Sequence, residues 1–254
     1  CSLRDSAVST IRCLNLFYGF GTENFATAVS YIDRFLSRVK VHPKYYSCLA
    51  SACFFLAAKF HQESEDIPSI DELVTLQRQT WKSSDLKRME LVVLEKLSWN
   101  LWTVTCPEIA RICCDIISSF CPNQTAPKLL DILQKYEVCV NYSCCAIYSP
   151  AALAVSLLHL SFREAAGPLS PAIVQCLLYL QSQTMVNDSE VHECTCAVVG
   201  ILDNYSNNPA LHPSCLPLPK PAPRVNLVQK PSFYGDTDLP TIEEEINMER
   251  CCLE

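Results

Sequence analysis

One stretch of the sequence, from Ser47 to Phe60, constrains the fold more than any other. It carries no charge before Lys59, and small and bulky apolar side chains alternate along its length. A helix that is apolar on every side belongs inside a bundle of other helices. This stretch is also shorter than the roughly 20 apolar residues that a membrane-spanning helix needs. We therefore predict a buried central helix with Pro43 near its start, where a missing N–H has no cost.

The same pattern recurs later in the chain, from Ser149 and Pro150 to Phe162. Around each central helix, apolar residues spaced at i, i+3/i+4 and i+7 predict four further helices. In the first half these are 3–18, 22–39, 69–76 and 83–97, and in the second half 107–120, 126–143, 169–182 and 188–205. The sequence therefore predicts an all-α fold with two five-helix bundles in tandem.

These patterns divide the chain into three parts. Residues 1–104 are expected to form the first helical domain and residues 105–205 the second. Residues 206–254 are rich in proline and lack helical periodicity, so we expect a flexible, disordered tail. The acidic end of this tail, Thr241–Met248, suits a short helix that forms on a partner rather than alone.

Composition excludes several classes of protein. With 49% hydrophobic residues the chain has ample material for a core, which excludes a wholly disordered protein. Alternating Val/Ile/Thr runs are scarce, which argues against a strand-rich fold. The net charge of −7 argues against a nucleic-acid partner, because phosphate neutralisation needs a dense basic face.

The chain holds 17 cysteines, which we expect to be reduced. Several fall at core positions of helical patterns, among them Cys48, Cys53, Cys113 and Cys139, where a free thiol packs as a small apolar group. With no signal-peptide pattern, this favours an intracellular protein. The sequence enters a helical pattern directly after Cys1, so we expect an N-terminal segment to be missing.

No catalytic motif stands out, which predicts a protein that is not an enzyme and needs no cofactor. His192, Cys194 and Cys196 are close in sequence, but residues at i and i+2 of a helix point apart, so we expect packing and no metal site. The final Cys-Cys-Leu-Glu ends in a residue unusual for a prenylation box, and no polybasic run precedes it. We therefore expect no membrane partner.

Two charged residues do not fit a purely structural account. Lys59 ends an otherwise uncharged helix, and Glu90 interrupts the apolar face of the fifth helix. They either pair with each other, reach water at a helix end, or face a groove where another protein docks. Arg4 and Asp33 lie on helices that should touch, so an internal ion pair is also expected.

Three segments resemble the cyclin family. Ala28–Ser37, Leu56–Phe60 and Leu86–Leu94 are similar, in order and spacing, to the second, third and fifth helices of the cyclin box. Val41–Tyr45 and the tail segment Phe233–Ile242 are more similar to the atypical cyclins of the G and I group than to mitotic cyclins. The resemblance implies two cyclin folds of five helices each.

The resemblance also implies a function and a site. It implies a non-catalytic subunit, nuclear and cytoplasmic, that binds and activates or targets a cyclin-dependent protein kinase in cell-cycle regulation. The alternative is an adaptor that recruits a protein phosphatase of the 2A type without activating a kinase. The residues matched to kinase contacts are Lys59, Phe60, Glu90, Leu94, Trp99 and Leu101, and Arg4 and Asp33 match a buried pair joining the first two helices.

The chain departs from mitotic cyclins in two places. The substrate-docking patch of those cyclins is built from large apolar side chains, whereas the matching positions here are Leu3, Ser6, Ala7 and Thr10. After Lys59 the family usually shows glutamates, whereas this chain has His61 and Gln62. We therefore expect no binding of Arg-x-Leu-type substrate peptides and a weaker negative field beside Lys59.

Overall fold

The protein is known from a computed structural model, which describes residues 2–77, 81–120, 128–166 and 171–207. Throughout these ranges the regular structure is helical, which confirms the all-α class. The first set of helices is α1 (Leu3–Tyr18), α2 (Thr22–Leu36), α3 (Tyr46–His61), α4 (Ile70–Gln77) and α5 (Ser83–Lys96). The second set is α6 (Cys106–Phe120), α7 (Leu129–Cys139), α8 (Pro150–Ala166), α9 (Pro171–Gln183) and α10 (Asp188–Asn207).

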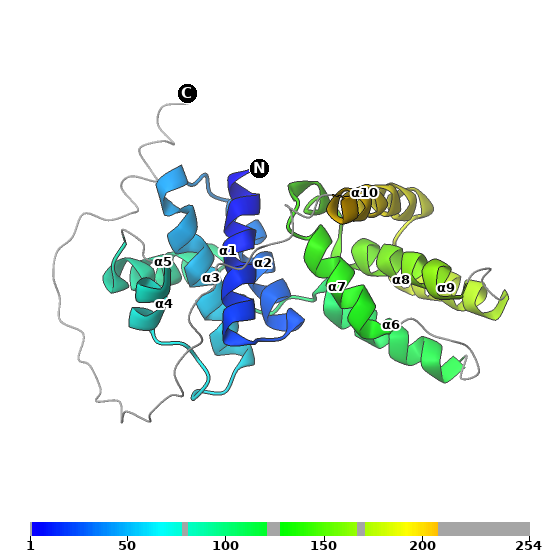
Figure 1. The fold of residues 1–254 in the computed structure, drawn as a ribbon, viewed down its shortest axis with the longest axis horizontal. Coiled ribbons are helices and arrows are strands. Elements are labelled where there is room, and N and C mark those ends of the chain that lie inside the picture. Colours follow the sequence, from blue (N-terminus) through cyan, green and yellow to red (C-terminus); the bar gives the residue numbers. More distant parts are fainter. Residues whose placement is uncertain (1, 78–80, 121–127, 167–170, 208–254) are drawn as a thin grey trace.

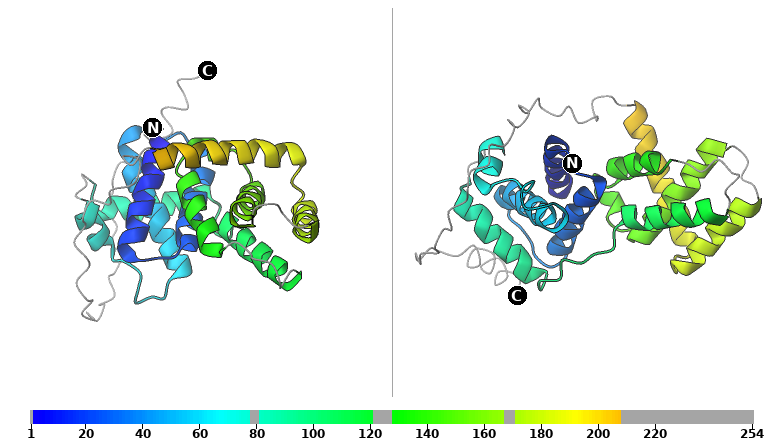
Figure 2. Two further views of the ribbon diagram at one scale, coloured as in Figure 1. Left: turned by 45° about the vertical axis from the view of Figure 1, so that its right-hand side comes forward. Right: turned by 90° about the horizontal axis from the view of Figure 1, so that it is seen from below.

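The two sets lie side by side along the long axis of the molecule (Figures 1 and 2). They are joined by residues 97–105, the segment in which the sequence predicts the domain boundary. The predicted tail lies outside the described residues, apart from its first two positions, which complete α10.

The uncharged helix α3 is the centre of the first set. Every residue from Cys48 to Ala58 is buried, and α1, α2 and α5 pack around it. The ring of Phe54 stacks on Tyr18 and Phe20, with ring centroids 5.7 and 5.8 Å apart. The prediction of a buried central helix is confirmed.

Helix α8 holds the same position in the second set, with α6, α7, α9 and α10 around it. Its residues from Ala152 to Leu158 are all buried. The one hydroxyl in this run, that of Ser156, donates a hydrogen bond of 3.2 Å to the carbonyl of Val191 on α10. Because this hydroxyl has a hydrogen-bond partner, burying it carries no penalty for an unsatisfied polar group.

Helix α7 differs most from expectation, because it ends at Cys139 instead of continuing to residue 143. In a continuing helix the carbonyl of Val140 would accept a backbone N–H one turn later. Here it accepts a hydrogen bond of 2.6 Å from Nη1 of Arg4. The chain then turns into a short 3-10 helix, Ser143–Cys145. A contact across the two sets therefore coincides with the end of this helix.

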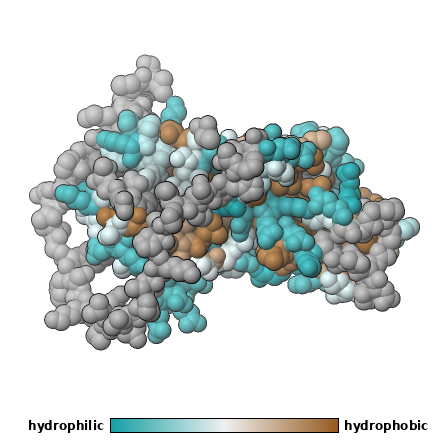
Figure 3. Space-filling model, in the orientation of Figure 1, coloured by the Kyte–Doolittle hydropathy of each residue, from teal (hydrophilic) through white to brown (hydrophobic). Residues whose placement is uncertain are grey.

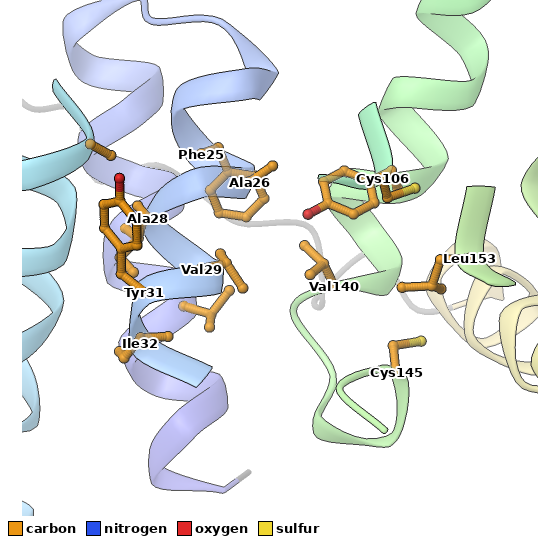
Figure 4. Close-up of a cluster of buried hydrophobic side chains, with 14 of the residues drawn as sticks. Phe25, Ala26, Ala28, Val29, Tyr31, Ile32, Cys106, Val140, Cys145 and Leu153 are labelled. Atoms are coloured by element: carbon orange, nitrogen blue, oxygen red, sulfur yellow. The ribbon is translucent and has the colours of Figure 1, made fainter. Parts of the chain in front are cut away.

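Apolar and polar contacts both join the two sets. Val29 of α2 faces Val140 and Leu153 of the second set (Figure 4). At the rim, the hydroxyl of Thr22 donates to a carboxylate oxygen of Glu137 at 2.7 Å. These contacts fix the second set against one face of α2.

The expected pair between Arg4 and Asp33 is present. Nε and Nη2 of Arg4 donate to the two carboxylate oxygens of Asp33 at 2.9 and 2.8 Å. Burial disfavours the charged form of Arg4, but the hydrogen bonds and charge of Asp33 outweigh it, so the pKa of Arg4 is raised. The expectation of a buried pair needs correction for one partner, because the Asp33 side chain is 30% exposed.

We expect Asp33→Ala to lower the free energy of unfolding by about 2–3 kcal/mol, because it removes the carboxylate that accepts two hydrogen bonds from a buried guanidinium. The loss stays below that of a fully buried pair, since Arg4 keeps the Val140 carbonyl. Urea unfolding followed by circular dichroism measures it. The control is Asp131→Ala, an exposed carboxylate expected to change stability by less than about 0.5 kcal/mol. Equal losses in the two variants would contradict the role of the pair.

Candidate partner-binding site

Lys59 and Glu90 meet at the surface of the first set. Lys59 lies in the last turn of α3 and Glu90 in the middle of α5, and these two helices pack together. Nζ of Lys59 is 2.5 Å from Oε1 of Glu90 and 4.2 Å from the centre of the Phe55 ring. The Lys59 side chain is 42% exposed and that of Glu90 13%. The two charges therefore pair with each other and still reach the solvent.

The apolar residues matched to kinase contacts lie at the ends of α3 and α5. Phe60 is exposed, Trp99 is 64% exposed, and Leu94 and Leu101 are half-buried against the core. Phe60 also contacts a residue that the sequence did not single out as a site residue, Trp102, edge to face at 6.3 Å. The roles of these residues in binding a partner stay predictions.

Elsewhere the surface is mixed. On the face shown in Figure 3, the apolar residues form separate patches between hydrophilic ones.

The turn after α5 holds two residues in the left-handed region. Ser98 has φ 56° and Trp99 φ 58°. The N–H of Trp99 donates to the carbonyl of Leu94 and the N–H of Ser98 to that of Glu95, both at 2.8 Å. This is the helix-ending pattern that usually contains glycine. Without glycine, each left-handed residue costs on the order of 1 kcal/mol.

Four contacts from α2 and the turn after it hold the last residue of α5 and the segment that follows it. Tyr31 donates its hydroxyl to the carbonyl of Leu101 at 3.0 Å, and Nη2 of Arg34 donates to that of Asn100 at 2.7 Å. The two remaining contacts join Ser30 to Thr103 and Arg38 to the carbonyl of Lys96. The backbone that carries Trp99 and Trp102 is therefore fixed from one side along its length.

His61 occupies a position where the resemblance leads one to expect a carboxylate. Its Nε2 lies 2.8 Å from the hydroxyl of Thr27, and burial lowers its pKa, although Glu108 opposes this. The lowered pKa favours the neutral form of His61. Its ring is bonded to Thr27 on α2, whereas the side chain of Lys59 is bonded to Glu90 on α5.

In the cysteine-rich segment of α10, the expectation of packing holds for Cys194 but not for His192 or Cys196, which are exposed. Cys194 is buried, whereas Cys196 is exposed, with Sγ 3.8 Å from Nε2 of His192. Among the described residues, no group of three or more His, Cys, Asp or Glu side chains is placed to hold a metal, and the cysteines of this part of the chain form no disulfide. None of the described helices is long and apolar enough to cross a bilayer.

Comparison with known proteins identifies the family. Residues 2–102 match the protein family described as "Cyclin, N-terminal domain". Cyclin-G1 of Sus scrofa is 30% identical over 96% of this chain and 83% of its own length, and cyclin-G2 of Mus musculus is 31% identical over 96% and 71%. The chain belongs to the cyclin family. The expectation of an atypical cyclin of the G and I group is confirmed, and cyclins are regulatory rather than catalytic proteins.

Solved structures agree on the fold. A viral cyclin from herpesvirus saimiri superimposes with a TM-score of 0.60 at 14% identity, covering 81% of this chain and 89% of its own. A chain of the CAK complex from Chaetomium thermophilum bound to ATP-gamma-S gives 0.55 at 14% identity, covering 85% and 68%. Two tandem cyclin folds are therefore the architecture of this cyclin.

We expect Lys59→Ala to change the free energy of unfolding by less than about 1 kcal/mol, because ion pairs that reach solvent contribute little to stability. Thermal unfolding followed by circular dichroism tests this. A large fall in melting temperature would show that the pair holds α3 and α5 together.

We expect no measurable binding of an Arg-x-Leu peptide to α1, because the matching surface lacks large apolar side chains. Ala7 is buried, Ser6 is small, and the hydroxyl of Thr10 is bonded to the Ser6 carbonyl at 3.1 Å, which leaves Leu3 alone as an exposed apolar residue of this group. Titration calorimetry with a synthetic peptide measures the affinity. A micromolar dissociation constant would overturn the expectation.

Proposed function

We propose that this cyclin binds a cyclin-dependent protein kinase through the surface that contains Lys59 and Glu90, and serves in cell-cycle regulation. Membership of the family supports a kinase partner, and one structural neighbour belongs to a CAK complex bound to ATP-gamma-S. The observation that carries the proposal is the position of the pair: two opposite charges, partly exposed, at the junction of α3 and α5.

The pair is suited to bind a protein backbone. An ammonium group has three donors and a carboxylate has two acceptor oxygens, so one mutual contact leaves both groups able to bind more. Lys59 can donate to a carbonyl of the partner while Glu90 accepts from an N–H. Since the pair is close to solvent, rearranging it has a low cost. The exposed ring of Phe60 adds apolar area beside it.

The proposed mechanism is a shift between two kinase conformations. In the free kinase a mobile helix lies outward and the catalytic Lys–Glu pair is broken. The cyclin holds that helix inward and so completes the active site. The shift is no larger than the difference between the cyclin's affinities for the two conformations.

A second candidate is an adaptor that recruits a protein phosphatase of the 2A type or another partner without activating a kinase. Two features favour it. The surface of α1 lacks the apolar patch expected of a substrate-docking cyclin, and His61 stands where the resemblance leads one to expect a carboxylate.

A kinase panel tests the proposal. We expect the full chain to bind and stimulate at least one purified cyclin-dependent kinase on a generic substrate, and Lys59→Ala/Glu90→Ala to reduce binding at least about tenfold, because charged hydrogen bonds at an interface are lost. The matched control is Lys135→Ala/Glu164→Ala, which removes an ion pair of the second set.

The outcomes separate the two functions. Equal losses from both double variants would show that the Lys59 surface is not the docking site. No binding across the panel, together with binding to purified phosphatase 2A subunits, would favour the adaptor.

A further inference from the structure

The exposed tryptophans next to the site have no structural explanation. Trp99 is 64% exposed and Trp102 is 71% exposed, and Val104 beyond them is exposed too. Tryptophan is the side chain most enriched among residues that dominate binding energy at interfaces. Only Trp99 is matched to a kinase contact by the resemblance, so Trp102 is left without a role.

The backbone that carries these side chains is strained and held. Ser98 and Trp99 adopt left-handed conformations that favour glycine. Such conformations persist only where the surroundings enforce them, and they concentrate at functional sites. Here the two residues bond back to α5, and Tyr31 and Arg34 of α2 bond the backbone directly after them. We call residues 97–104, held in this way, the tryptophan loop.

The tryptophan loop is continuous with the site of Lys59 and Glu90. Trp102 contacts Phe60, the residue directly after Lys59. The contact is between a ring edge and a ring face, and most of the Trp102 surface remains open to solvent. A partner that covers Lys59 and extends past Phe60 therefore meets Trp102 next. It meets an apolar surface already fixed in place, which lowers the entropy cost of binding.

We propose that Trp102 is a specificity-determining contact for the kinase partner, and that Tyr31 and Arg34 are positioning residues that hold the tryptophan loop in its binding conformation. This inference rests on the proposed kinase function. The part of the kinase that it requires is an apolar side chain adjacent to the backbone that binds Lys59. Kinases with a charged side chain at that place are rejected, because the charge would be buried without a partner.

The chain offers an internal control for a direct test. It contains three tryptophans, and the third, Trp81, is half-buried with Nε1 3.3 Å from the hydroxyl of Ser47, at the other end of α3 from Lys59. The full chain labelled with 5-fluorotryptophan gives one ¹⁹F resonance for each. When the unlabelled kinase that binds best in the panel is added, we expect the Trp99 and Trp102 resonances to shift and that of Trp81 to stay.

Affinity measurements give the energetic test. We expect Trp102→Ala to weaken binding of that kinase at least about tenfold, as for a dominant interface tryptophan. The matched control is Phe120→Ala, an equally exposed aromatic residue on α6, which should leave the affinity unchanged. Trp102→Ala should also reduce the differences in affinity between kinases of the panel.

The positioning role has its own readout. Tyr31→Phe removes only a buried hydroxyl, and we expect it to shift or broaden the Trp102 resonance of the free chain while that of Trp81 is unchanged. An unmoved Trp102 resonance would show that Tyr31 does not position the loop.

The measurements distinguish failure of the Trp102 proposal from failure of the proposed kinase function. If Lys59→Ala weakens binding but Trp102→Ala does not, the role of Trp102 is wrong and the kinase function stands. If no kinase binds, both the role of Trp102 and the proposed kinase function are wrong.

Discussion

One guanidinium joins three parts of this molecule. Arg4 of α1 binds both carboxylate oxygens of Asp33 on α2 and, with its remaining nitrogen, the carbonyl of Val140 at the end of α7. A planar group with fixed donors allows little freedom in how these three helices meet. Because the guanidinium is buried, loss of one of these acceptors leaves one of its donors without a hydrogen bond. The relative orientation of the two cyclin folds depends on this contact.

Helix α2 contacts three separate parts of the molecule. One side packs on α3, another faces the second set through Val29, and a third holds the segment after α5 through Tyr31 and Arg34. The elements that form the surface around Lys59 thus all pack against α2 or bond to it. A substitution within α2 is therefore expected to affect both the contact between the two folds and the candidate binding site.

Sequence patterns were sufficient for the parts of the structure that local chemistry decides. The burial of α3 follows from its lack of charge. That Lys59 and Glu90 pair was one of three alternatives left open by the sequence, and the structure shows the pair. The early end of α7 could not be predicted, because it coincides with a hydrogen bond from a side chain of α1 that is remote in sequence. Trp102 was missed as a site residue because its exposure and its contact with Phe60 depend on how distant segments pack, which no local pattern signals.

The buried cysteines make the reactivity of this chain toward alkylating reagents depend on its folding. Burial raises the pKa of Cys48 to about 12 and that of Cys113 and Cys194 to about 11, so these thiols stay protonated at neutral pH. The thiolate is the form that reacts with alkylating reagents. Cys196, in contrast, is exposed to a reagent in the folded chain. The number of alkyl groups that a molecule acquires thus records whether its helical bundles have opened, and mass spectrometry can count them.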